Sequence, residues 1–149
     1  MSSIKKIEDV LGEEGIFVST MSGYSMYPML RNRRDTIVVK TYEGRLKKFD
    51  VPLYKQGSRY ILHRIIEVRP ESYVIRGDNC EQKEYGITDE HILGVLVGFY
   101  RDDKQIDMNG WKYKLYVQLQ YRLYGLRWIM RRARNLAAKV FRWFKKERK

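Results

Sequence analysis

Three short segments of this chain contain the residue types that acyl-transfer chemistry needs. Ser25 lies in residues 23–28, where glycine, serine and proline favour a turn. His63 lies in an apolar run, residues 60–66, that is typical of a strand. A serine hydroxyl is a poor nucleophile until a base within hydrogen-bond reach takes its proton. Histidine acts as such a base near neutral pH, because its ordinary pKa is about 6.5. The two residues are therefore candidates for nucleophilic catalysis, although His63 by itself could equally be a hydrogen-bonded histidine of the core.

The third segment, residues 77–79, has the sequence Gly-Asp-Asn and completes a resemblance to a known family. In their order and spacing, the three segments resemble the signal peptidase I family of serine endopeptidases. They are most similar to the branch that has histidine where the bacterial enzymes have lysine. The resemblance covers about residues 23–100, roughly half of the chain. It implies that Ser25 is the nucleophile and that His63 is the general base.

The resemblance also implies an acid that orients the imidazole, as the third member of such a triad does. In the histidine branch this acid follows the Gly-Asp-Asn motif, which places Glu84 in the role, where the family usually has aspartate. Asp78 is the competing candidate. Its counterpart in the lysine-type relatives mainly holds the active-site loops together, and we expect Asp78 and Asn79 to do so here. The sequence leaves open whether Glu84 or Asp78 orients His63.

The remaining site residues are also implied by the resemblance. The backbone N–H of Ser25 is expected to form the oxyanion hole. Some relatives add a serine hydroxyl two residues before the nucleophile, but this chain has Gly23 there, which we expect to supply a tight turn. Met26 is expected to pack beside Ser25 and to line the substrate cleft. A peptide or protein substrate would bind as an extended strand beside that cleft.

The pattern of apolar residues predicts a mainly β fold: a compact antiparallel unit of the signal-peptidase catalytic type, flanked by helices. A short helix is expected through Leu11, capped by Ser2 or Ser3 and ended by Gly12 or Gly15. Short runs of β-branched and aromatic residues, separated by turns, then predict strands. These strands are expected at residues 16–19, 36–40, 51–55, 60–68, 73–76 and 93–100.

The excess positive charge of the chain lies at its C-terminal end. Residues 1–110 contain 17 Lys and Arg and 17 Asp and Glu, whereas residues 111–149 contain 13 Lys and Arg and the single acid Glu147. Apolar residues recur there at steps of three and four, which predicts a long basic amphipathic helix, bent or broken at Gly125. We therefore expect a peptidase-like domain over residues 1–110 and a helical tail over 111–149. The tail has three interpretations: contact with an anionic membrane surface, packing on the body, and, least favoured, nucleic-acid binding.

The composition argues against disulfides, a metal site, secretion and a membrane-spanning segment. A single cysteine, Cys80, excludes an internal disulfide framework, and His63 and His91 lack companions at metal-ligand spacing, so we expect no metal and no cofactor. The first residues show no secretory signal, and the longest apolar run, residues 92–100, is too short to span a bilayer. We expect a cytoplasmic protein whose tail is a candidate for peripheral contact with the inner face of the membrane.

The sequence thus predicts a serine endopeptidase that cleaves a peptide or leader segment through Ser25 and His63. Two alternatives stay open. One is a catalytically inactive β-fold binding module that its basic tail holds at a membrane or partner. The other is regulatory self-cleavage, as in the related repressor domains. That reading is less favoured, because those proteins use lysine as the base and carry a DNA-binding domain in front.

Overall fold

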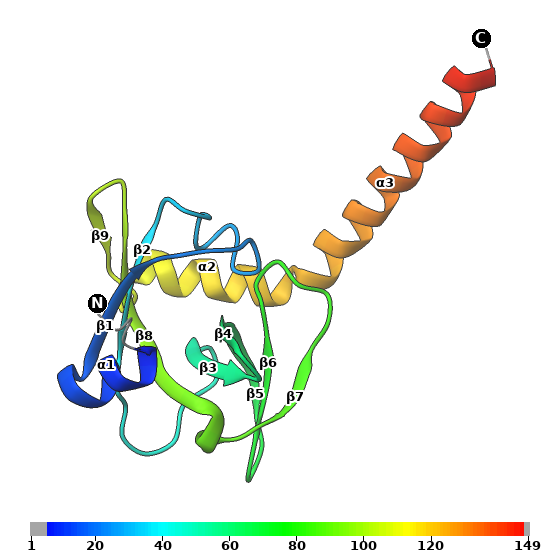
Figure 1. Ribbon diagram of the computed structural model, residues 1–149. Helices are drawn as coiled ribbons and strands as arrows, with labels where there is room; N and C mark the ends of the chain where they lie inside the picture. The colour runs from blue at the N-terminus through cyan, green and yellow to red at the C-terminus, as the bar shows by residue number, and fades with distance from the viewer. Residues whose placement is uncertain (1–5, 148–149) are drawn as a thin grey trace.

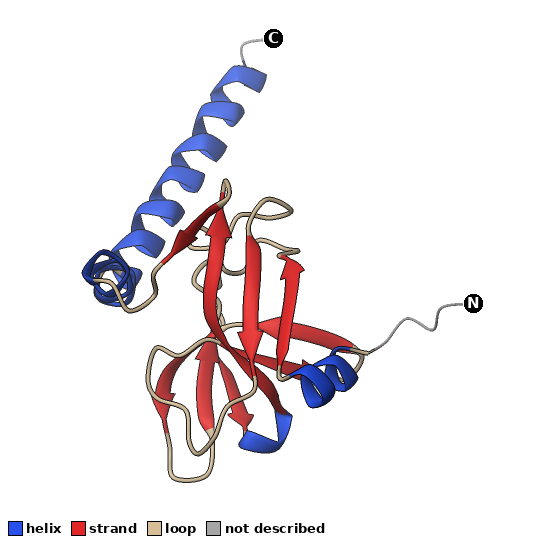
Figure 2. Ribbon diagram, turned by 90° about the vertical axis from the view of Figure 1, so that its left-hand side faces the viewer, coloured by secondary structure: helices blue, strands red, loops and turns tan. Residues whose placement is uncertain are grey.

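Two antiparallel sheets form the body of the protein in the computed structural model, which describes residues 6–147 (Figures 1 and 2). The first sheet has six strands, and its main order is β1 (Ile16–Thr20), β2 (Thr36–Lys40), β8 (Ile92–Arg101), β3 (Pro52–Gln56) and β4 (Arg59–Leu62), with β9 (Lys104–Ile106) paired to β8. The second sheet has the order β5 (Arg64–Val68), β6 (Tyr73–Arg76) and β7 (Glu84–Ile87). All pairs between described strands are antiparallel.

Most strands form where alternating or continuous apolar residues predict them. In β2 the side chains of Ile37 and Val39 are buried while Val38 between them is not, as expected for a strand with one face on the core. The strands at 36–40 and 73–76 have the expected bounds, and β3 and β4 form an antiparallel hairpin. The sequence did not predict β7 and β9, because both are short and mostly exposed and lack an apolar alternation.

The run at residues 60–68 is two strands, which corrects the prediction of one. The chain leaves the ladder at His63, so that β4 pairs with β3 in the first sheet and β5 pairs with β6 in the second. Each half finds a different partner strand, and a single straight strand could not pair with both. His63 therefore lies at the point where the two sheets meet.

Two clusters of buried apolar side chains hold the sheets together. The larger cluster joins the first sheet to residues around Ser25 and includes Met21, Met26, Met29, Leu30 and Leu53. The smaller cluster lies between the two sheets and includes Leu46, Tyr54, Ile65, Tyr73 and Ile75. Removing this surface from water is the main favourable contribution to folding.

The N-terminal helix α1 (Ile7–Glu14) begins later than the sequence predicts and extends beyond Leu11 to Gly15, one of the two glycines expected to end it. Its N-cap is Lys6, and the capping residues proposed from sequence, Ser2 and Ser3, lie outside the described residues. The helix continues through Gly12 and ends at Gly15, whose φ of 69° is a left-handed conformation that glycine adopts readily.

The C-terminal region consists of two helices with different surroundings. Helix α2 (Trp111–Arg122) lies on the body and buries Val117 and Gln120, whereas α3 (Tyr124–Glu147) projects away from it (Figure 1). The break at Leu123 is close to the bend expected at Gly125. Of the region expected to form a tail, residues 111–122 thus pack on the body and only α3 stands apart. Within residues 6–147, no helix combines the length and the apolar character needed to cross a bilayer.

Candidate active site

His63 and Glu84 form the central contact of the candidate site. His63 occupies the junction between β4 and β5, and Glu84 begins β7, where it lies opposite Ile75 of β6. His63 Nδ1 and Glu84 Oε1 are 2.7 Å apart. A carboxylate can only accept hydrogen bonds, so in the neutral imidazole this contact places the proton on Nδ1 and leaves Nε2 with a free lone pair. The imidazole is thereby held in the tautomer that a general base requires.

Tyr54 supports this contact from β3 and is a site residue that the sequence analysis missed. Its hydroxyl donates to Glu84 Oε2 at 2.6 Å and lies 3.3 Å from His63 Nδ1. Burial, and then the hydrogen bond to Glu84, raise the pKa of Tyr54 well above its ordinary value, so the phenol stays protonated and acts as a donor. No local pattern marks this residue, because its place follows from strand register: Tyr54 pairs with Ile61, two residues from His63.

Gly77 brings the Ser25 segment and the imidazole together. A Cβ atom added to Gly77 would lie 2.6 Å from the Ser25 carbonyl oxygen and 3.0 Å from His63 Nε2. Both atoms are therefore close to one point, and only a residue without a side chain fits between them. The next residues fasten the two segments: Asn79 N–H donates to the Ser25 carbonyl at 2.7 Å, and Asn79 Nδ2 donates to the Tyr24 carbonyl at 3.2 Å.

Ser25 and His63 line the same cleft, which has a volume of about 380 Å³. Neither the hydroxyl nor the backbone N–H of Ser25 makes a hydrogen bond to another residue in the range 6–147. Both groups are therefore free of competing protein partners. A hydrogen bond between Ser25 Oγ and His63 is not formed in this structure, and such contacts often tighten only when substrate is present.

The cleft differs from the sequence-based expectation at Met26. This side chain is completely buried in the larger core cluster, and it is Met21 that lines the cleft. The reason is the turn that follows Gly23, which directs Met26 inward, where Leu30 N–H donates to its carbonyl. Gly23 itself has a φ of 104°, which other residues rarely adopt, and its N–H donates to Asn32 Oδ1 at 2.8 Å.

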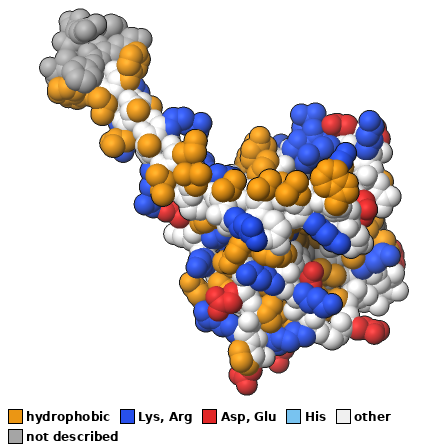
Figure 3. All heavy atoms as spheres, turned by 180° about the vertical axis from the view of Figure 1, so that it is seen from behind, with side chains coloured by type: hydrophobic (Ala, Val, Ile, Leu, Met, Phe, Trp, Pro, Cys, Tyr) orange, Lys and Arg blue, Asp and Glu red, His pale blue; other side chains and the backbone are white. Residues whose placement is uncertain are grey.

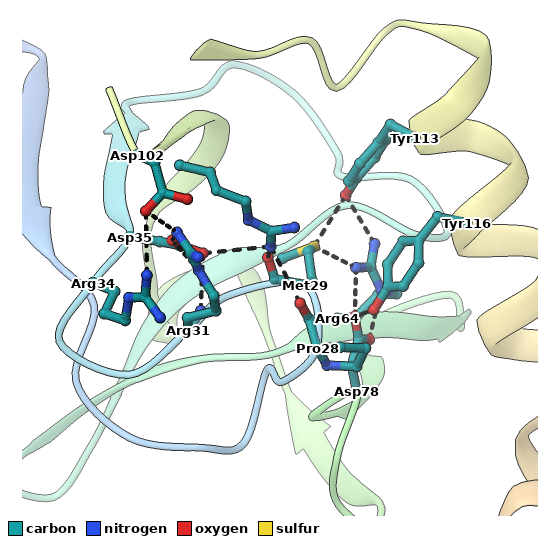
Figure 4. A network of polar contacts seen from close by, with 11 residues as sticks. Pro28, Met29, Arg31, Arg34, Asp35, Arg64, Asp78, Asp102, Tyr113 and Tyr116 are labelled. Carbon is teal, nitrogen blue, oxygen red and sulfur yellow. Dashed lines mark hydrogen bonds and ion pairs between the residues drawn. The ribbon is translucent and has the colours of Figure 1, made fainter. Parts of the chain in front are cut away.

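Asp78, the other candidate acid, contacts Arg64 (Figure 4). No hydrogen bond joins it to His63. Two hydrogen bonds of 2.8 Å join the carboxylate to the guanidinium, and Tyr116 of α2 donates to the same carboxylate at 3.0 Å. Burial lowers the pKa of Arg64, but the contact with Asp78 more than offsets this, so the pKa lies above its ordinary value and the pair is ionised. Gln120 donates to the Asp78 backbone carbonyl, which fastens α2 to residues 77–79.

Two other kinds of site are relevant near these residues, a cysteine nucleophile and a metal centre. Burial and the nearby Glu84 carboxylate raise the pKa of the Cys80 thiol, which disfavours the reactive thiolate. Among the side chains described, no group of three or more histidine, cysteine or acidic residues could hold a metal ion.

Comparison with known proteins gives no relative of this chain. No protein-family model matches it, and neither a curated protein nor a solved structure is significantly similar.

Proposed function

We propose that this protein is a serine endopeptidase of the signal peptidase I type, in which Ser25 is the nucleophile, His63 the general base and Glu84 the acid that orients it. The observation that carries the proposal is the contact of 2.7 Å between His63 Nδ1 and Glu84. It leaves Nε2 as the acceptor on the side of the ring that approaches Gly77 and the Ser25 segment. Histidine and serine contribute to one cleft, as a nucleophile and its base must.

The reaction follows from these positions. His63 Nε2 takes the proton of the Ser25 hydroxyl as Oγ attacks the peptide carbonyl carbon, and the Ser25 N–H stabilises the oxyanion that forms. The protonated imidazole, held by Glu84, then gives its proton to the leaving amine, and an ester remains on Ser25. A water molecule that His63 deprotonates attacks this ester, and the acid product leaves as Ser25 regains its proton.

The position of the cleft in the first sheet favours an extended peptide as substrate. The main strand order of that sheet begins with β1 and ends with β4, and residues of both strands line the cleft. Edge strands present unpaired N–H and C=O groups, to which an extended segment can add as a further strand. Apolar side chains at the cleft, including Phe17, Met21 and Leu53, favour apolar side chains on the substrate.

Cleavage of a mixture of synthetic peptides, followed by mass spectrometry, tests the proposal. The wild-type chain should cut a reproducible subset of peptides, and Ser25→Ala should leave them intact. Ser22→Ala is the matched control, because Ser22 is a neighbouring serine that lines the same cleft, and this variant should retain activity. Cleavage that persists in Ser25→Ala would refute the assignment of the nucleophile. A folded wild-type chain that cuts no peptide would favour the inactive binding module.

A further inference from the structure

Helix α3 exposes an apolar face along most of its length. Large hydrophobic side chains at helical spacing are between 46% and 71% exposed in this helix, although such residues are usually buried. The members of this face are Leu126, Ile129, Met130, Leu136, Val140, Phe141 and Trp143. A helix in contact with water alone has no need of such a face.

The apolar surface continues onto α2. Trp111, Leu115, Leu119 and Leu123 are between 44% and 70% exposed, on the side of α2 that faces away from its buried Val117. Figure 3 shows hydrophobic side chains along both helices on one side of the molecule. We call this surface, together with the apolar face of α3, the α2–α3 face. Hydrogen bonds from α2 to Asp78 fix the α2 part of this face to the body.

The side of α3 opposite its apolar residues is strongly basic. Arg127, Arg131, Arg134, Lys139 and Arg142 fall between the apolar positions, and the described side chains of this helix include no acid. Arg131 donates to Asn79 and Arg132 pairs with Glu81 at the start of the helix. Further along, Arg134 and Lys139 have no ion-pair partner among the described side chains. The helix therefore combines an apolar face with unneutralised positive charge.

We propose that the α2–α3 face binds the surface of an anionic lipid bilayer, with α3 lying in the plane of the interface. The apolar side chains would enter the boundary between headgroups and acyl chains, and the arginines and lysines beside them would meet lipid phosphates. The tryptophans of this face, Trp111 and Trp143, fit this boundary, because an indole is apolar apart from one N–H. This inference goes beyond the proposed peptidase activity and does not rest on it.

Charge favours a lipid surface over a second copy of the chain as the occupant. Two copies that met through α3 would bring their basic residues together with only one acid in each helix sequence, Glu147, and like charges repel. An anionic bilayer neutralises the same basic residues and also removes the apolar face from water. The start of α3 also reaches the candidate active site, since Tyr124 donates to the Cys80 carbonyl at 2.7 Å. Binding would therefore hold residues 77–80 close to the membrane surface.

Co-sedimentation of the full chain with vesicles tests the proposal. The probes are vesicles of phosphatidylcholine alone and vesicles with one third phosphatidylglycerol, each at 0.1 M and 1 M NaCl. We expect binding to the anionic vesicles at 0.1 M salt and much weaker binding to the neutral ones. Binding should fall steeply at 1 M, because the screening length shrinks from about 10 Å to about 3 Å.

Two pairs of substitutions separate the apolar from the charged contribution. Leu136→Gln with Phe141→Gln should weaken binding to anionic vesicles at least tenfold, since both side chains would leave the acyl boundary (order of magnitude). Arg134→Gln with Lys139→Gln should weaken it about fivefold for each charge. None of these side chains is buried in the fold. Val18→Gln is the control: it removes a side chain that is 54% exposed, but on β1 of the body, and should bind as the wild type does.

Three outcomes would overturn the proposal. The first is a full chain that ignores anionic vesicles at 0.1 M salt. The second is a Leu136→Gln, Phe141→Gln variant that binds like the wild type. Charge alone would then explain the binding, and any polyanion, including nucleic acid, could take the place of the lipid. The third is a stable dimer, seen by light scattering, that these two substitutions dissociate. In that case a second copy covers the face.

Discussion

Two acid–base pairs lie side by side where β4 passes into β5, and they differ in how completely the protein surrounds them. His63 and Arg64 are consecutive residues, yet His63 contacts Glu84 and Arg64 contacts Asp78. The side chains of Arg64 and Asp78 are each 3% exposed. Each also has a hydrogen bond to another residue: Arg64 donates to the Phe49 carbonyl, and Asp78 accepts from the Tyr116 hydroxyl. The side chains of His63 and Glu84 are 11% and 25% exposed, and His63 lines the cleft.

This difference separates a structural pair from a candidate catalytic one. A buried ion pair needs its remaining donors and acceptors satisfied, and the contacts of Arg64 with Phe49 and Tyr113 do this. A general base needs the opposite: one nitrogen held and the other left free for a proton. The same stretch of backbone provides both because the break between β4 and β5 sends consecutive side chains into different surroundings.

The largest effect is expected on activity. Ser25→Ala and His63→Ala should each lower peptide cleavage at least about 10⁴-fold, and the double variant should be no worse than either, because members of one catalytic unit are not additive. Urea unfolding should give nearly the wild-type free energy for Ser25→Ala, since its hydroxyl makes no hydrogen bond to a described residue. Multiplicative losses in the double variant would argue that the two residues act separately.

The next largest effect is expected on stability. Asp78→Asn leaves the Arg64 guanidinium buried without its counter-charge, which should lower the free energy of unfolding by about 3–5 kcal/mol. Glu84→Gln is the matched change in the other pair. It should cost about 1 kcal/mol or less, because the amide oxygen still accepts one hydrogen bond and the site is partly exposed. Urea titration of both variants measures the contrast, and equal losses would remove the distinction between the pairs.

Tyr54→Phe tests the support behind the catalytic pair. The substitution keeps the buried ring but removes the hydrogen bond to Glu84, which is worth about 1.5–3 kcal/mol when the acceptor is charged. We expect cleavage to slow about tenfold. Tyr42→Phe is the control, because its hydroxyl contacts only the Asp89 backbone carbonyl among the described residues. A Tyr54→Phe variant with full activity would show that Glu84 is held without the phenol.

The smallest effect concerns the contact of α1 with the β3–β4 hairpin. Hydrogen bonds from Lys55, and next from Tyr60, lower the pKa of Glu8 from 4.5 to about 2. A lowered pKa means that the folded state favours the carboxylate. The contribution of Glu8 is thus present above pH 4.5 and is lost as the pH falls towards about 2. Glu8→Gln should therefore lose less stability than the wild type between pH 6 and pH 3 in urea unfolding, and an equal loss would contradict the contact.

The resemblance noted in the sequence pairs Ser25 with His63, and the structure places both residues at one cleft. The strands at 36–40 and 73–76 could be predicted from their apolar residues. The acid could not be chosen, because the choice depends on which sheet receives each side of the break at His63. The sequence did not identify Tyr54 either, because the role of this residue depends on the register of β3 with β4 and not on a local pattern.

The C-terminal helices show a second limit of the sequence. Both have the apolar and basic periodicity of one long amphipathic helix, and this periodicity says nothing about which part meets the body. Packing of α2 depends on single contacts such as Tyr116 with Asp78, which join residues far apart in the chain. The buried position of Met26 likewise depends on the turn after Gly23, whose backbone conformation the sequence only partly implies.

The rate at which a fluorophosphonate modifies Ser25 tests the proposed catalytic unit most directly, because the reagent needs an activated serine but no knowledge of the substrate. Peptide mapping should find the adduct on Ser25 in the wild type. The rate should fall at least about 100-fold in His63→Ala and by a smaller factor in Glu84→Gln, and the double variant should match His63→Ala. Asp78→Asn, assayed where it remains folded, should keep most of the wild-type rate. Modification of Ser25 at an unchanged rate in His63→Ala, or of Ser22 in its place, would contradict the assignment of the base and the nucleophile.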